Sequence, residues 1–175
     1  MPVGRWTRLR SKKIAILGMF AAIAIVLSIV ENTVMNMFNL AIPGAKPGFA
    51  NIAVVLALYY LGGMEAGIVA AVKCTAVFFA TGAATTLLFS IGGTALAMAG
   101  MIAAKRCHMF SAAGVSALGG FLNNLGQLAV MALLGGSAGF FYYLPVLSVL
   151  GVGFGLLMGV LAEAVLRRRL RPIQK

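Results

Sequence analysis

The residues best suited to chemistry are a few polar side chains inside long apolar stretches. Lys73 lies near the middle of one stretch, and Asn123, Asn124 and Gln127 lie in another. Gln127 follows the two asparagines by four and three residues, so all three amides lie along one side of a helix. Polar groups at membrane depth are costly and often mark ligand or ion sites. This pattern predicts that the lysine and the amides bind a ligand. The alternative for the lysine is a salt bridge or snorkelling. The alternative for the amides is hydrogen bonding between helices.

A second group of candidates surrounds the loop Asn39–Asn51. The loop contains two prolines and two glycines, and it leads into the amino end of an apolar segment. Free N–H groups at a helix amino end attract anions, and Lys46 stands just before this one. We predict that the loop acts as a lid over an anionic ligand; the alternative is a turn of fixed shape with no ligand. The predicted ligand-binding residues are Glu31, Lys46, Asn51, Lys73, Asn123, Asn124 and Gln127.

Acidic residues are too few for metal-dependent catalysis. The chain has no aspartate, and its three glutamates are widely separated in the sequence. Because Mg²⁺ requires carboxylate oxygens, we do not expect this chain alone to act on a diphosphate. No Gly-rich loop ends in Gly-Lys-Ser/Thr, so ATP hydrolysis by that route is not expected either. Cys74 and Cys107 have no metal or redox spacing and are expected to be inert thiols, so no catalytic or metal site is predicted.

Apolar helices must position the candidate residues. The chain is 62% hydrophobic and 10% charged, against about 25% charged residues in a soluble domain. A bilayer core about 30 Å thick needs roughly 20 apolar helical residues. We therefore predict an all-α polytopic membrane protein, a six-transmembrane-helix bundle in one domain of residues 1–175, with basic ends at 1–13 and 167–175. The expected helices are at about 14–30, 51–61, 65–80, 86–104, 111–134 and 144–166, and the second and third are short for a full crossing.

Basic residues predict the orientation. Twelve of the fourteen lysines and arginines fall at residues 5–13, 105–106 and 167–175. Lysine and arginine gather in cytoplasmic loops, so six crossings place these three segments, and hence both termini, in the cytoplasm. The net charge of +11 is then explained by orientation in the membrane and by contact with anionic headgroups of the lipid bilayer. Binding to nucleic acid is not predicted. We predict a multi-pass protein of a bacterial inner membrane.

Small residues recur every four positions on two helices. Gly151, Gly155 and Gly159 form one row, and Gly18 and Ala22 form another. Such rows let membrane helices approach closely. Each row predicts either packing within the bundle or an interface with another membrane subunit.

Four motifs carry a resemblance to a known family: Pro43–Ile52, Ala57–Ala66, Asn123–Leu128 and Tyr142–Leu147. Through them the chain resembles the Gx transporter family, also known as heptaprenyl diphosphate synthase component I, over about residues 14–166. That family is similar to the S components of energy-coupling factor transporters. These are six-helix membrane proteins with an outward-facing ligand pocket, which work with a membrane coupling subunit and paired ATPases.

The resemblance implies a substrate-binding transport protein for a small, anionic molecule, S-component-like and dependent on partner subunits for energy. Two other functions stay open: an accessory membrane subunit of a soluble synthase in heptaprenyl diphosphate and quinone metabolism, or a membrane component of flavin-linked extracellular electron transfer. The chain departs from the family in two places. Gly18 and Ala22 replace an Ala-xxx-Ala spacing on the first helix, and Asn123 stands where many relatives have histidine.

Overall fold

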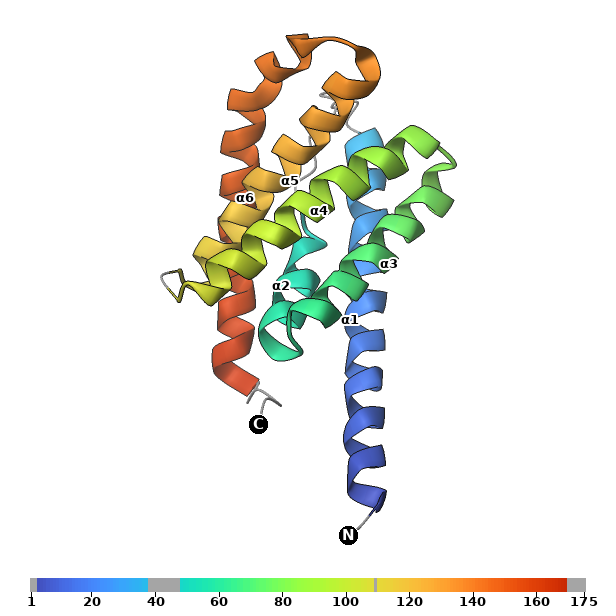
Figure 1. Cartoon of the computed structure of the whole chain (residues 1–175), viewed down its shortest axis with the longest axis vertical. Coiled ribbons are helices and arrows are strands. Elements are labelled where there is room, and N and C mark those ends of the chain that lie inside the picture. The colour runs from blue at the N-terminus through green and yellow to red at the C-terminus, as the bar shows by residue number, and fades with distance from the viewer. Residues whose placement is uncertain (1–2, 38–47, 109, 170–175) are drawn as a thin grey trace.

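The described part of the chain is helical. In a computed structural model, residues 3–37, 48–108 and 110–169 are described, and they contain six α-helices, one 3-10 helix and no strand. This agrees with the predicted all-α class and number of helices. The elements are α1 (Val3–Met37), α2 (Asn51–Tyr60), α3 (Gly63–Thr81), α4 (Ala84–Arg106), α5 (Ala112–Gly135), η1 (Ala138–Tyr143) and α6 (Leu144–Arg169) (Figure 1).

Five of these helices are long and apolar enough to cross a membrane, and α2 is not. The 10 residues of α2 extend only about 15 Å, half of the hydrocarbon thickness. The prediction that the third helix is also short is wrong, because α3 has 19 residues. Turns at Gly62 and Gly82 delimit α3, and both glycines have positive φ, 125° and 66°. The first described residues of α1 and the last of α6 lie at the same end of the molecule (Figure 1).

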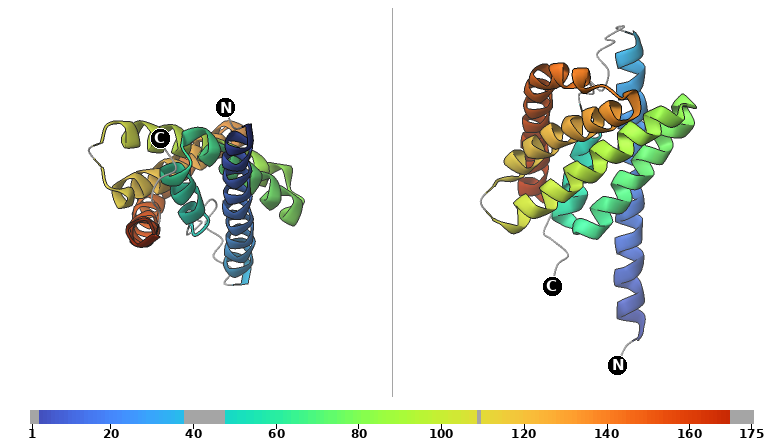
Figure 2. Two further views of the ribbon diagram at one scale, coloured as in Figure 1. Left: turned by 90° about the horizontal axis from the view of Figure 1, so that it is seen from below. Right: turned by 45° about the horizontal axis from the view of Figure 1, so that its top comes forward.

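The five long helices pack side by side in the order in which they follow one another in the chain. α3 lies between α1 and α4, and α5 lies between α4 and α6. The short α2 packs against α1, α3, α5 and α6, so it lies inside the arrangement (Figure 2). Six of its ten residues are buried. The polar groups at the amino end of α2 are therefore held within the protein, away from lipid.

Glycines allow α5 and α6 to approach closely. A Cβ added at Gly120 would lie 2.1 Å from the carbonyl oxygen of Gly151, and one added at Gly155 would lie 2.7 Å from that of Ser116. Gly151, Gly155 and Gly159 are all buried. This row therefore packs on α5 of the same chain. The prediction that it meets another subunit is corrected, because α5 already covers it.

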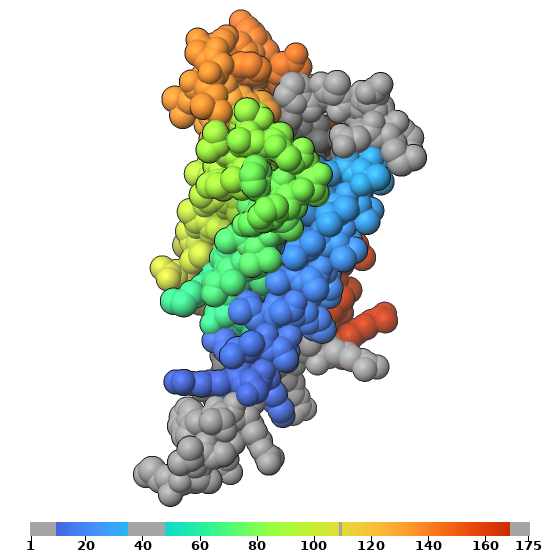
Figure 3. Space-filling model, turned by 90° about the vertical axis from the view of Figure 1, so that its right-hand side faces the viewer, coloured from blue at the N-terminus to red at the C-terminus, as the bar shows by residue number. Residues whose placement is uncertain are grey.

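The other small-residue row lies on an open face. Gly18 and Ala22 are exposed on α1, and a Cβ added at Gly18 would meet no atom within 4 Å. Figure 3 shows α1, α3 and α4 side by side on one face of the molecule. The α1 row stays a predicted partner interface.

Polar contacts join the helices at the end where the two termini lie. Lys105 of α4 donates a hydrogen bond of 2.7 Å to the carbonyl oxygen of Leu58, near the carboxyl end of α2. Its ammonium group also lies 5.1 Å from the centre of the Tyr59 ring. Lys13 of α1 forms an ion pair with Glu65 of α3. These contacts bind α1 to α3 and α4 to α2 beside the basic clusters.

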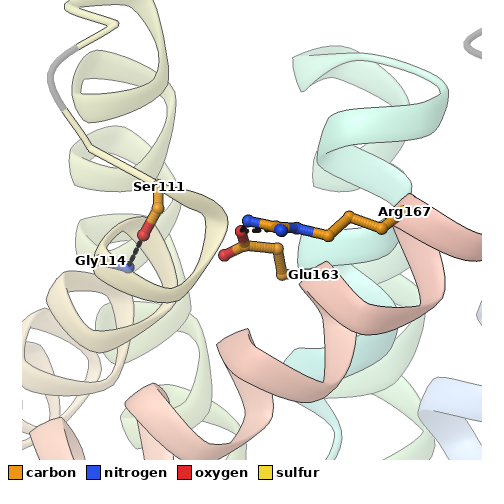
Figure 4. Close-up of polar contacts among 4 residues, drawn as sticks. All are labelled: Ser111, Gly114, Glu163 and Arg167. Atoms are coloured by element: carbon orange, nitrogen blue, oxygen red, sulfur yellow. Dashed lines mark hydrogen bonds and ion pairs between the residues drawn. The ribbon is translucent and has the colours of Figure 1, made fainter.

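Two local contacts stabilise helix ends on α5 and α6 (Figure 4). The hydroxyl oxygen of Ser111 accepts a hydrogen bond of 3.3 Å from the backbone N–H of Gly114, which caps the amino end of α5. On α6, the Arg167 guanidinium lies 2.6 Å from a carboxylate oxygen of Glu163. The guanidinium side chain is exposed, so this ion pair adds at most about 0.5 kcal/mol to stability.

Candidate functional site

A small polar cavity lies among five helices. Its volume is about 30 Å³, enough for about two water molecules. Side chains of α1 to α5 line it, together with Gly48 just before α2. The lining residues are Ser28, Glu31, Asn32, Gly48, Asn51, Lys73, Cys74, Val77, Ser90, Thr94, Asn123 and Gln127.

Five of the seven predicted ligand-binding residues meet in this cavity. They are Glu31, Asn51, Lys73, Asn123 and Gln127, and they come from four different helices. Lys46 and residues 39–47 of the proposed lid, the loop 39–51, lie outside the described residues. The chain thus brings together the polar groups of four apolar segments, which reduces their contact with lipid.

Lys73 contacts an amide within the cavity. Its ammonium group donates a hydrogen bond to the side-chain oxygen of Asn51 at 3.2 Å. None of the ion pairs among the described residues involves Lys73. The alternative of a direct salt bridge from Lys73 to Glu31 is therefore not the arrangement observed. An ammonium group has three N–H donors, so hydrogen-bonding capacity is left beside the cavity.

Glu31 holds the turn that precedes α2. Its carboxylate accepts a hydrogen bond from the backbone N–H of Gly48, and its residue is only 4% exposed. The carbonyl of Gly48 in turn accepts from the backbone N–H of Asn51 at 2.9 Å. Gly48 has φ of +77°, a conformation that favours glycine. The carboxylate of Glu31 therefore occupies part of the position where an anion was expected to bind at the amino end of α2.

Two amides of α5 border the cavity without a hydrogen-bond partner in the described part of the chain. Gln127 is only 3% exposed, and among the described residues neither its side chain nor that of Asn123 makes a hydrogen bond. Neither amide is among the fully buried side-chain atoms that lack a partner in the described residues, which are Ser116 Oγ and Asn124 Oδ1. The amides of Asn123 and Gln127 therefore face the open space of the cavity, where a water molecule or a polar ligand can form hydrogen bonds with them.

Asn124 belongs to helix packing and not to the cavity. Its amide donates a hydrogen bond of 2.7 Å to the carbonyl oxygen of Leu147 on α6, and it is not a lining residue. A Cβ on Gly151 would lie 2.6 Å from the donating nitrogen, so this glycine makes room for the bond. The alternative of hydrogen bonding between helices is the arrangement observed for Asn124, and its predicted ligand role is corrected.

Sequence reasoning missed several polar residues of the cavity. Cys74 of α3 lies 3.2 Å from the hydroxyl of Thr94 and 3.5 Å from the carbonyl of Ser90, both on α4. Ser28 and Asn32 add polar groups from α1. The spacing offered a signal, because Ser90 and Thr94 are four residues apart on one helix side.

The fold and the cavity together define a polytopic helical membrane protein with a buried polar site. A family model described as heptaprenyl diphosphate synthase component I matches residues 20–165. The chain belongs to this family. Searches of curated proteins and of solved structures find no match.

Proposed function

We propose that this protein binds a small anionic solute in the cavity among α1 to α5, as the non-catalytic, S-component-like subunit of a transport system in a bacterial inner membrane. The observation that carries the proposal is Gln127, an amide 3% exposed that lines the cavity and has no hydrogen-bond partner among the described residues. An amide in that position contributes little to the fold on its own and is suited to bind a ligand.

Charge favours an anion. Lys73 lies beside Asn123 and Gln127 in the lining, so a cation and two amides can act on the same bound group. A lysine in the hydrophobic region costs at least about 2.5–3.5 kcal/mol. A bound anion would offset part of that cost, because a hydrogen bond to a charged group contributes about 1.5–3 kcal/mol.

The proposal requires partners. The chain has no P-loop motif, so energy for transport would come from separate ATPases through a membrane coupling subunit. The exposed Gly18 and Ala22 row on α1 is suited to close contact with another membrane helix. Both termini would be cytoplasmic, in keeping with the basic residues at the end where they lie.

The family's name favours a second candidate function. It describes one component of a heptaprenyl diphosphate synthase, and an enzyme of that name needs a further component. In this alternative the chain would be a non-catalytic membrane partner of a soluble synthase. It predicts that the purified protein retains an aspartate-rich soluble partner, whatever residue occupies position 73.

The experiment is mass spectrometry of small molecules retained by protein purified in mild detergent. Wild type should retain an anionic molecule, and Lys73→Met and Gln127→Leu should each lose it about 10- to 100-fold, since each removes about 1.5–3 kcal/mol of binding. Lys12→Met, a change of an exposed lysine on α1, is the matched control and should retain it. The fold of Lys73→Met should persist, because the change removes a costly charge.

Equal retention by wild type, Lys73→Met and Gln127→Leu would overturn the proposal. Recovery of a soluble synthase with all of these variants, and of no small molecule with any, would instead establish the second candidate.

A further inference from the structure

A second void lies between α3 and α4 and is almost entirely apolar. Its volume is about 360 Å³, within the roughly 300–1,000 Å³ typical of ligand pockets. Small residues open it on both helices: Gly67 and Ala71 on α3, and Ala95 on α4. Leu87 and Ile91 add branched side chains. The seam between these two helices lies on the face shown in Figure 3. An apolar groove at that position would face the hydrocarbon region of a bilayer.

The groove adjoins the polar cavity. Cys74 and Thr94 line both voids, and the sulfur of Cys74 lies 3.2 Å from the hydroxyl oxygen of Thr94. A third void, of about 10 Å³, is bordered by Lys73 and Asn123 of the cavity and by Met98 of the groove. The three voids lie next to one another, from the half-buried Lys73 to the outer surface of α3 and α4, and the Cys74–Thr94 contact separates the cavity from the groove.

The sizes of the voids set the dimensions of a ligand. The cavity of about 30 Å³ holds about two water-sized atoms, which fits the two oxygens of a carboxylate. The groove volume of about 360 Å³ is less than that of one turn of a partner helix about 10 Å across. It has room for a flexible hydrocarbon chain.

We infer that these voids bind a fatty acid, with its carboxylate at Lys73 and Gln127 and its chain in the groove between α3 and α4. The inference rests on the proposed function and names the class of the anionic ligand. The surrounding lipid is as apolar as the groove, so the groove fixes the position of the ligand's hydrocarbon chain and adds little to its affinity. The ligand would enter from the bilayer through the seam between α3 and α4, past Cys74 and Thr94.

The test is photo-crosslinking of the full chain in lipid nanodiscs with dodecanoate that carries a diazirine at its methyl end. Crosslinks should map to α3 and α4. Gly67→Leu fills the groove without a clash, because no atom lies within 4 Å of a Cβ there. It should remove most of the crosslinking to α3 and α4, because the leucine side chain occupies the space that the methyl end of the ligand would take. The matched control is Gly153→Leu on α6, which also meets no atom within 4 Å and should leave the yield unchanged.

Competition separates this inference from the proposed function. Unlabelled dodecanoate should compete, butyrate should compete weakly, and Lys73→Met should lower the yield about 10- to 100-fold. Equal competition by butyrate would refute the chain site and leave an anion site in place. Stronger competition by farnesyl diphosphate would refute the carboxylate assignment. Crosslinks spread over the exposed faces of α1 and α6, with no effect of Gly67→Leu, would show ordinary lipid contact only. An unchanged crosslinking yield with Lys73→Met would refute the proposed function as well.

Discussion

Replacing Gly120 with alanine should destabilise the bundle strongly, because two backbones meet at that point. The new Cβ would lie 2.1 Å from the carbonyl oxygen of Gly151. Contacts under 3.0 Å are essentially never seen for a Cβ, and the opposing atom belongs to the backbone, so no side-chain rotation can relieve the clash. α5 and α6 would have to separate by about 1 Å along their whole contact.

The magnitude follows from two opposing terms. Overpacking at a backbone contact is expected to cost about 3 kcal/mol, the upper end of the usual range. Alanine restores about 1 kcal/mol through its helix propensity, so the net loss is about 2 kcal/mol. Gly153→Ala is the control on α6, where a Cβ meets no atom within 4 Å. It should gain up to about 1 kcal/mol, which separates the two variants by about 3 kcal/mol, or roughly 6–12 °C in Tm.

Thermal unfolding can be followed with the protein's own thiol. Cys74 is only 4% exposed, so a thiol-reactive dye should label it on unfolding, in a Cys107→Ser background that removes the exposed thiol. Gly120→Ala should unfold well below wild type, and Gly153→Ala at or above it. If Gly120→Ala proved as stable as Gly153→Ala, the close packing of α5 on α6 described above would be wrong.

Three further predictions concern topology and the helix ends. In intact cells, Cys107 should react with an impermeant maleimide only after permeabilisation, whereas Ser137→Cys in a Cys107→Ser background should react directly; the opposite pattern would reverse the predicted orientation. Lys105→Met should lower stability by about 1–3 kcal/mol, because the carbonyl of Leu58 loses a charged donor at 2.7 Å; an unchanged Tm would show that this contact contributes nothing. Glu163→Gln should change stability by at most about 0.5 kcal/mol, because its arginine partner is exposed; a loss of several degrees would mean that this carboxylate has a second structural role.

The class of protein was predictable from the sequence because lipid imposes it. A helix that crosses a bilayer needs a long apolar run, and such runs are visible without any tertiary information. The polar residues inside those runs were visible for the same reason. Lys73 and Gln127 stand out in apolar segments, and both line the cavity.

What only the tertiary structure decided is the side on which each helix meets its neighbours. Asn123 and Asn124 are adjacent and chemically identical, yet they point about 100° apart around α5. One borders the cavity, and the other bonds to α6. The row of Gly151, Gly155 and Gly159 fits an internal or an external helix equally well by sequence, and it is the position of α5 that buries it. The cavity itself exists because the short α2 packs among the long helices. That arrangement depends on contacts between segments far apart in the chain, which the local sequence pattern does not encode.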